Sequence, residues 1–244
     1  MKVMIIGGTS GIGLALAEHY ARQGATLALC GRDTGRLDGH ALARHERVVR
    51  YQFDIADRAA LEQAVGQFSR AGLDLLIVTA GQYTDAAAIA ANREATLPVV
   101  RTNIGGLYHA FDAAGDVMRQ QGHGHMVAVA SIAGLLDDYP NASLYSASKR
   151  AAIAICDAYR KALAPFGIAV TTIVPGYVDT AALRSLNRGD ASGKPFLQSE
   201  AQAVARMADA IDRRAERCVF PWQLHWQVRV FNLLPRALQR LRKK

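Results

Sequence analysis

Short apolar runs alternate with longer stretches of helical periodicity along most of this chain, and this alternation is the strongest constraint on its fold. The strand-like runs cover residues 3–6, 26–30, 48–53, 73–79, 125–130 and 169–174. Apolar residues at three- and four-residue spacing predict helices over residues 12–23, 59–70, 99–120 and 143–166. Near-continuous apolar strands are typical of a sheet with helices on both faces. The sequence therefore predicts an α/β fold, a doubly wound Rossmann fold with a central parallel β-sheet.

Length and charge limit the number of domains and the kinds of partner. The chain has 244 residues, of which 50% are apolar, enough for one large domain and tight for two. We expect one Rossmann-type catalytic domain over residues 1–221 and an appended basic amphipathic helix over residues 222–244. The net charge of +8 arises mainly after residue 212, and basic residues are not interleaved with aromatic ones across a face. Nucleic acid is therefore not an expected partner.

The cysteines and histidines indicate whether the protein binds a metal, and the position of the first strand bears on its cellular location. Cys30, Cys156 and Cys218 are widely spaced without a Cys-x-x-Cys pattern, which indicates buried free thiols. His123 and His125 have no cysteine or acidic partner nearby, so we expect no metal site. The first strand begins almost at Met1 and leaves no room for a signal peptide, which favours a cytoplasmic location.

A glycine-rich turn follows the first strand and leads into the first predicted helix. Glycines allow the backbone to turn sharply and approach a pyrophosphate, which the helix N-terminus stabilises. The predicted cofactor contacts in this turn are Gly7, Thr9, Ser10, Gly11, Ile12 and Gly13. The position after the first strand of a βαβ unit favours a dinucleotide over a purely geometric turn.

The residues after the second and third strands bear on the identity of the dinucleotide. Arg32 stands where an acidic residue would bind the ribose hydroxyls of NAD, and a guanidinium there suits the 2′-phosphate of NADP. We therefore expect NADP(H) in preference to NAD(H); the alternative is that Arg32 merely solvates a strand end. Asp54, next to Ile55, is a candidate hydrogen-bond acceptor for the adenine amino group, and its alternative role is a helix N-cap.

These motifs resemble the short-chain dehydrogenase/reductase (SDR) family in its one-domain form, over nearly the whole chain. The resemblance includes the glycine turn, Asp54, and a Val78-Thr79-Ala80-Gly81 echo of the family's Asn-Asn-Ala-Gly motif. The family's four catalytic positions are matched in order by Asn103, Ser131, Tyr145 and Lys149. Further cofactor contacts implied by the resemblance are Ile55, Ala80, Gly81, Tyr145, Lys149, Pro175, Gly176, Val178 and Thr180.

The resemblance implies a role for each catalytic residue. Tyr145 would donate the proton to a carbonyl oxygen, and Lys149, four residues later on the same helix face, would favour the phenolate and hold the nicotinamide ribose. Ser131 would orient the substrate oxygen with a hydrogen bond. Asn103 would bend its helix and hold a water that links Lys149 to solvent. The implied activity is an NAD(P)-dependent oxidoreductase, a carbonyl reductase or alcohol dehydrogenase.

Two other activities and several partners are compatible with the residues. A cofactor-retaining epimerase or dehydratase would show no net cofactor turnover, and a non-catalytic NADP-sensing protein would not need the catalytic pair. The small-molecule substrate is expected to be partly apolar, because Leu135, Leu136, Tyr139, Tyr177 and the polar loop at residues 180–198 form the expected pocket wall. The resemblance implies a homo-oligomer, a dimer or a tetramer, through the helices at residues 99–120 and 143–166.

The last part of the chain has a basic amphipathic pattern. Apolar residues recur there at helical spacing among arginines and lysines. They are Trp226, Val230, Leu233, Leu234, Ala237, Leu238 and Leu241. This pattern fits peripheral contact with an anionic membrane surface, and equally fits packing over the substrate cleft or a partner subunit.

Overall fold

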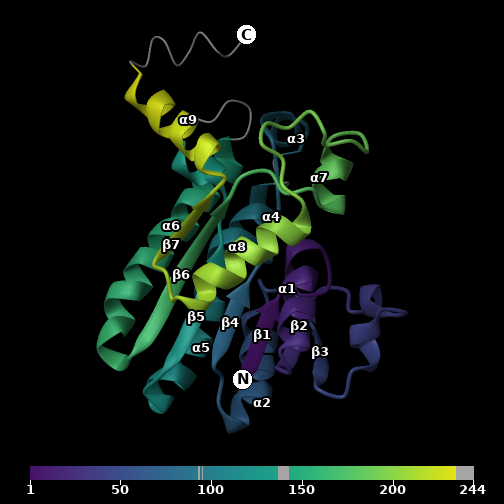
Figure 1. Ribbon diagram of the computed structural model, residues 1–244, viewed down its shortest axis with the longest axis vertical. Helices are drawn as coiled ribbons and strands as arrows, with labels where there is room; N and C mark the ends of the chain where they lie inside the picture. Colours follow the sequence, from purple (N-terminus) through teal and green to yellow (C-terminus); the bar gives the residue numbers. More distant parts are fainter. Residues whose placement is uncertain (93, 95, 137–142, 235–244) are drawn as a thin grey trace.

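A parallel sheet of seven strands forms the centre of the molecule in a computed structural model that describes residues 1–92, 94, 96–136 and 143–234 (Figure 1). The strand order is β3-β2-β1-β4-β5-β6-β7, and every pair of neighbours is parallel. The strands are β1 (Lys2–Ile6), β2 (Thr26–Gly31), β3 (Val48–Gln52), β4 (Leu75–Val78), β5 (Gly124–Val129), β6 (Ile168–Pro175) and β7 (Arg217–Phe220). The predicted doubly wound fold is confirmed.

Alternate residues of the central strands supply two separate hydrophobic cores. In β1, Val3 and Ile5 face one core and Met4 and Ile6 the other, and all four are buried. A strand whose side chains are buried on both faces reads as a continuous apolar run, because successive side chains point to opposite faces. Helices cover both faces of the sheet in consequence.

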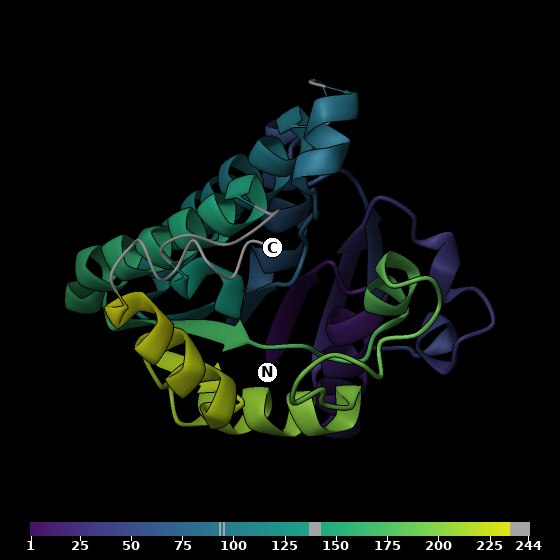
Figure 2. The same ribbon diagram turned by 90° about the horizontal axis from the view of Figure 1, so that it is seen from above.

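The helices are arranged in two layers, one on each side of the sheet (Figure 2). One layer contains α1 (Gly11–Arg22) and α8 (Glu200–Asp212), which contact each other. The opposite layer contains α2 (Arg58–Phe68), α5 (Leu107–Gln121) and α6 (Ser143–Leu163). The shorter helices are α3 (Ala86–Ala91), α4 (Thr96–Val100) and α7 (Ala181–Leu186), of which α3 and α7 lie at the upper right in Figure 1.

The helix predicted over residues 99–120 is interrupted. A π-helical segment, η5 (Arg101–Gly106), separates α4 from α5. A Cβ at Gly106 would lie 2.7 Å from Cγ2 of Ile55, so this segment approaches the loop after β3 closely. Such segments bulge the backbone outward by one residue, which sequence periodicity does not reveal.

The segment at residues 180–198 contains more regular structure than the predicted loop. Thr180 caps α7 through a hydrogen bond from the Leu183 amide (3.1 Å), and Gln198 pairs with Val178 in an isolated parallel bridge. The prediction of a loop is therefore wrong for residues 181–186, which form α7. The strand β7 and the helix α8, which follow it, were not predicted.

The last described helix is α9 (Trp222–Leu233), within the predicted amphipathic segment. The remainder of that segment, residues 235–244, lies outside the described residues. No helix in the part of the chain described here is long and apolar enough to cross a membrane. The division into a domain at residues 1–221 and an appended helix stays a prediction.

Candidate active site

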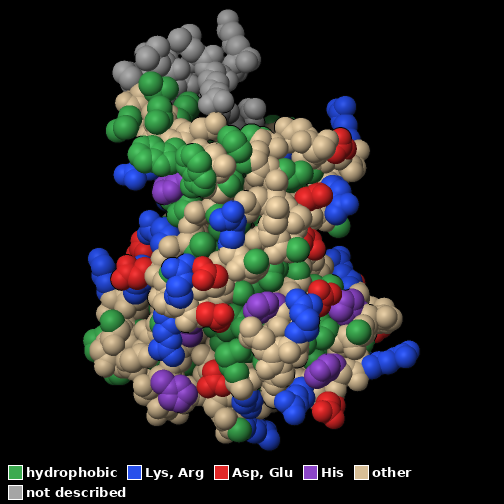
Figure 3. All heavy atoms as spheres, viewed as in Figure 1, with side chains coloured by type: hydrophobic (Ala, Val, Ile, Leu, Met, Phe, Trp, Pro, Cys, Tyr) green, Lys and Arg blue, Asp and Glu red, His purple; other side chains and the backbone are tan. Residues whose placement is uncertain are grey.

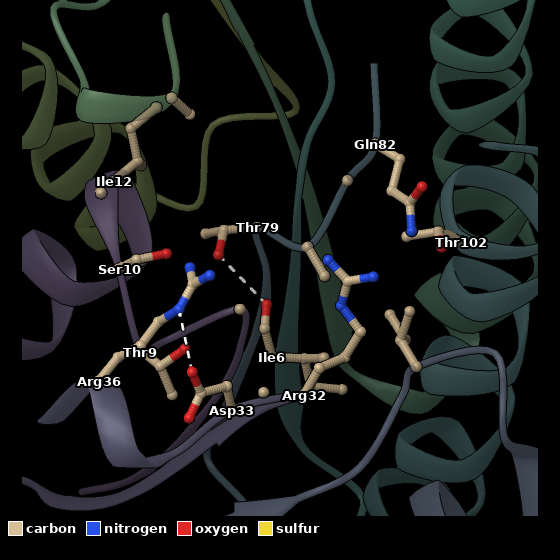
Figure 4. A pocket seen from close by; sticks show the side chains of 18 of the residues that line it. Ile6, Thr9, Ser10, Ile12, Arg32, Asp33, Arg36, Thr79, Gln82 and Thr102 are labelled. Atoms are coloured by element: carbon tan, nitrogen blue, oxygen red, sulfur yellow. Dashed lines mark hydrogen bonds and ion pairs between the residues drawn. The ribbon is translucent and has the colours of Figure 1, made fainter. Parts of the chain in front are cut away.

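A cavity of about 550 Å³ lies at the carboxyl ends of β1 to β4, where ligands bind in doubly wound sheets (Figure 4). Twelve of the residues predicted to contact a cofactor line it, from the glycine turn, the strand ends and α7. They are Gly7, Thr9, Ser10, Gly11, Ile12, Gly13, Arg32, Asp54, Ile55, Ala80, Gly81 and Thr180.

The glycine turn fits against its neighbours so closely that a side chain would not be accommodated. Gly7 has a φ of +92°, and a Cβ there would lie 2.5 Å from Thr79 Oγ1. A Cβ at Gly13 would collide with the Gly7 carbonyl oxygen. Ser10 occupies the N-cap of α1 without a side-chain capping bond within the described residues, which leaves the first amides of the helix to the cavity. This cradle fits the pyrophosphate of a dinucleotide.

Two arginines reach the cavity from the end of β2. Arg32 and Arg36 are exposed, and their guanidinium groups point in the same direction in Figure 4. Arg36 Nε lies 3.4 Å from the Asp33 carboxylate, and Asp33 also lines the cavity. Sequence reasoning identified Arg32 but not Arg36, although both follow the same strand.

Asp54, the acidic residue after β3, does not cap the helix that follows it. Asp54 Oδ1 accepts a hydrogen bond from the Ala56 amide (2.9 Å), within the turn that precedes α2. The N-cap of α2 is Asp57, which accepts from Ala60 N (3.1 Å). The helix-cap interpretation of Asp54 is therefore wrong, and its place on the cavity wall is compatible with the adenine contact.

Asn103 is held inside the π-helical segment by three hydrogen bonds. Its Oδ1 accepts from Gln82 N, and its Nδ2 donates to Gln82 O and to Ser148 Oγ, all within 2.8–2.9 Å. The Ser148 hydroxyl donates in turn to the Tyr145 carbonyl (2.8 Å). Only 3% of Asn103 is exposed, so this network joins the end of β4 to α6 in the interior of the protein.

Lys149 is buried beside this network. Its ammonium donates to the Val129 carbonyl at the end of β5 (3.1 Å) and lies 5.9 Å from the centroid of the Tyr145 ring. A Cβ at Gly81 would lie 3.1 Å from Lys149 Nζ and 3.4 Å from Asn103 Oδ1. Burial lowers the pKa of Lys149 to about 8, because an ammonium loses its hydration there. Its proton is therefore exchangeable near neutral pH.

Ser131 begins the short helical turn η6 (Ile132–Leu135) that follows β5. Its hydroxyl accepts a hydrogen bond from Ala133 N (3.2 Å). This turn packs on α6 at very short range: Ser146 donates to the Ala133 carbonyl, and a Cβ at Gly134 would lie 2.8 Å from the backbone of Lys149. The turn with Ser131 and the helix with Tyr145 are thus fixed to each other.

Five predicted cofactor contacts do not line the cavity: Tyr145, Lys149, Pro175, Gly176 and Val178. Lys149 borders the cavity through Gly81, which lines it and approaches Lys149 Nζ closely. Gly176 instead accommodates α9, since a Cβ there would lie 2.8 Å from Leu224 Cδ2. Val178 is buried in the core below α8.

An aromatic neighbour of Tyr145 and an apolar wall complete the site. The ring of Tyr83, which sequence reasoning did not identify, lies 5.0 Å from the Tyr145 ring. Beyond the expected wall residues Leu135, Leu136 and Tyr177, a small apolar cluster includes buried Ile132, Leu224 and Val228. Tyr139, the other named wall residue, lies outside the described residues.

Known proteins are similar to this chain in sequence. A sequence model described as short chain dehydrogenase matches residues 1–191. An uncharacterized oxidoreductase of Mycobacterium tuberculosis is 28% identical over 248 residues, which cover 98% of this chain and 96% of that protein. An uncharacterized oxidoreductase of Staphylococcus saprophyticus is 33% identical over 188 residues, which cover 73% of this chain and 79% of that protein.

Solved structures are similar to this chain in fold. A short chain dehydrogenase/reductase family protein has a TM-score of 0.80 at 25% identity, covering 90% of this chain and 94% of that one. A short chain dehydrogenase from Burkholderia cenocepacia in complex with NADP has a TM-score of 0.84 at 22% identity, covering 99% of this chain and 96% of that one.

Proposed function

The chain belongs to the short-chain dehydrogenase family, and from this premise we propose that it transfers a hydride between NADP(H) and a partly apolar carbonyl compound or secondary alcohol. The observation that carries the proposal is the contact of Lys149, Asn103 and Gly81 at the rim of the cofactor cavity. Tyr145 projects from the same helix one turn before Lys149. The four-residue spacing brings phenol and ammonium to one face.

In the direction of carbonyl reduction, Tyr145 supplies the proton. A carbonyl oxygen gains negative charge as the hydride arrives, and a phenol within hydrogen-bond reach neutralises it. The ammonium of Lys149 stabilises the phenolate that remains. Ser131, fixed against α6, donates a second hydrogen bond that orients the oxygen.

Lys149 also relays the proton in this proposal. With a pKa of about 8, its ammonium is mostly protonated at pH 7 yet gives up a proton readily. Asn103 does not touch the substrate; it fixes the end of β4 to α6 through Gln82 and Ser148. It is a positioning residue that holds Lys149 at the rim of the cavity.

The cofactor, when bound, supplies or accepts the hydride. The glycine turn and the N-terminus of α1 would hold its pyrophosphate, and Thr180 would contact its nicotinamide end. Arg32 and Arg36 would bind the 2′-phosphate, since two guanidinium groups at one strand end attract a dianion. Support for NADP comes also from two relatives in fold, the Burkholderia cenocepacia enzyme in complex with NADP and a protein described as ElxO with NADP bound.

A substrate panel with a tyrosine variant tests the reaction. Aldehydes, ketones, quinones and secondary alcohols are assayed with NADPH and NADH, following nicotinamide absorbance. Tyr145→Phe is expected to lower kcat on the best substrate by about 100-fold or more, the usual contribution of a general acid. Tyr108→Phe is the matched control, because Tyr108 lies exposed on α5 (42%). Full activity of Tyr145→Phe would contradict the mechanism.

Arginine variants test the cofactor preference. Arg32→Ser and Arg36→Ser are expected to raise the KM for NADPH by about tenfold or more each, as a lost charge-assisted bond of roughly 1.5 kcal/mol or more implies. The KM for NADH should change little, because it lacks the phosphate. Arg22→Ser, at the end of α1, is the control. An equal rise for both cofactors would contradict a phosphate contact.

Net cofactor turnover separates this proposal from its alternatives. An epimerase or dehydratase with a retained cofactor converts substrate without a steady absorbance change, and an NADP-sensing protein converts none. The homo-oligomer, dimer or tetramer, remains a proposal as well. Val100, the last residue of α4, is an apolar residue that is 39% exposed within the expected interface. Light scattering on the purified protein measures its mass.

A further inference from the structure

The helix α9 presents a stripe of large apolar side chains to solvent. The exposed fractions are 65% for Trp222, 59% for Trp226, 54% for Val230 and 84% for Leu233. At 3.6 residues per turn these four positions fall within about 80° of arc on one side of the helix. Figure 3 shows hydrophobic side chains gathered over α9 at the upper left.

The opposite side of the same helix is fixed to the protein body. Leu224 and Val228 are buried in the cluster with Ile132, and Asn232 Nδ2 donates to the Leu135 carbonyl (2.7 Å). The exposed stripe is therefore not the face with which α9 packs on its own domain. Because the fixed face rests on η6, the stripe is carried on an element in contact with the turn that follows Ser131.

The sequence segment that contains the helix carries basic residues without acidic ones. Residues 217–244 contain seven arginines and lysines and no aspartate or glutamate, and Arg217 among them is paired with Asp157 of α6 (2.8 Å). One of them, Arg229, lies on α9 with its guanidinium carbon 5.7 Å from the centroid of the Trp226 ring. Cation and apolar side chains thus share one surface of the helix.

We propose that this face of α9 docks on an anionic lipid surface. Tryptophan prefers the level of the lipid headgroups, where its ring is half in hydrocarbon and its N–H stays hydrated. Basic residues near such a surface are attracted by its negative potential, and residues 217–244 contain no acidic residue of their own that would oppose this attraction. A helix with an apolar stripe and a basic flank lies in the plane of the interface.

The tryptophans make the docking directly observable. The chain has two tryptophans, and both lie on α9 in the stripe. Their emission therefore reports on this helix alone. Vesicles of phosphatidylcholine with phosphatidylglycerol are expected to shift the emission to the blue and to sediment the protein. Vesicles of phosphatidylcholine alone should do neither, and high salt should release the protein.

Variants locate the contact. The double variant Trp226→Ser and Leu233→Ser keeps Trp222 as reporter, and its apparent vesicle affinity is expected to fall by about tenfold or more. Arg229→Gln should weaken binding less and reduce its salt dependence. Val49→Ser is the matched control, because Val49 is 42% exposed on the edge strand β3, and it should bind as the unaltered chain does.

The proposal is overturned by any of three results. Equal binding to neutral and anionic vesicles would remove the charge argument. Unchanged binding by the double variant would place the contact elsewhere. A blue shift that appears with rising protein concentration without lipid would assign the stripe to self-association. The vesicle and salt measurements on the unaltered chain decide the matter even if the double variant fails to fold, and none of them depends on enzymatic activity.

Discussion

Replacing the buried lysine by methionine is expected to abolish the proposed activity and to stabilise the protein at neutral pH. Only 7% of Lys149 is exposed, and burial lowers its pKa from 10.5 to about 8. A shift of this size corresponds to about 3 kcal/mol at roughly 1.4 kcal/mol per pKa unit. The native state therefore bears a penalty of that order for keeping the ammonium charged.

The pH dependence follows from the direction of the shift. Below pH 8 the amine is charged in both states, and the penalty is fully present. Between pH 8 and 10.5 the unfolded chain binds the proton and the native one does not, so stability rises with pH. Lys149→Met has no such titration. Its stability advantage should fall from about 3 kcal/mol at pH 7 to under about 1 kcal/mol at pH 10, before the lost hydrogen bond to Val129 is subtracted.

Urea unfolding of both proteins at the two pH values measures this change. The lost hydrogen bond lowers the stability advantage of Lys149→Met by about 1 kcal/mol, and by the same amount at each pH. The informative quantity is therefore the change, from pH 7 to pH 10, in the stability difference between the two proteins. Lys161→Met is the matched control, because Lys161 lies exposed on the same helix. A stability difference between Lys149→Met and the unaltered chain that is equal at pH 7 and pH 10 would refute the desolvation argument.

Three further substitutions test the packing around the site. Gly81→Ala should lower kcat by about ten- to a hundredfold while the protein stays folded, because its methyl displaces the flexible end of Lys149; an unchanged kcat would contradict the proposed place of the ammonium. Ser148→Ala should cost about 1–3 kcal/mol in urea unfolding, since Asn103 Nδ2 loses a buried acceptor; a neutral effect would mean that the network is not needed. Leu224→Ala should cost about 2–5 kcal/mol by the cavity it leaves, measured in the same way; a change below 1 kcal/mol would show that α9 is not anchored there.

Strands and the glycine turn could be predicted from the sequence because they obey local rules. A strand buried on both faces must be apolar at every position, and the turn after β1 must be glycine where a Cβ would strike Thr79 or the Gly7 carbonyl. The edge strand β7 escaped detection for the converse reason. It has four residues, begins with the exposed Arg217, and pairs only with β6.

Other features depend on contacts between distant parts of the chain. The π-helical segment lies where Gly106 meets Ile55, about fifty residues earlier, and helical periodicity does not report that contact. Arg36 reaches the cavity because the short turn η1 (Gly35–Leu37) follows β2 and brings it back beside Asp33. Likewise, Tyr83 meets Tyr145 only once β4 and α6 are assembled. The sequence on either side of these residues does not predict the contacts that they make.

Thr79 stands at the second position of the family's Asn-Asn-Ala-Gly motif, and its contacts show what this position requires in the protein. Thr79 replaces an asparagine, and its hydroxyl donates to the Ile6 carbonyl at the end of β1 (3.2 Å). Its oxygen also occupies the space that a Cβ at Gly7 or Gly13 would need. A short side chain with one donor therefore joins β4 to β1 and packs against the two glycines of the turn. Since threonine meets both conditions, the substitution leaves the cradle intact, and Val78 beside it is free to serve the hydrophobic core, where it is 3% exposed.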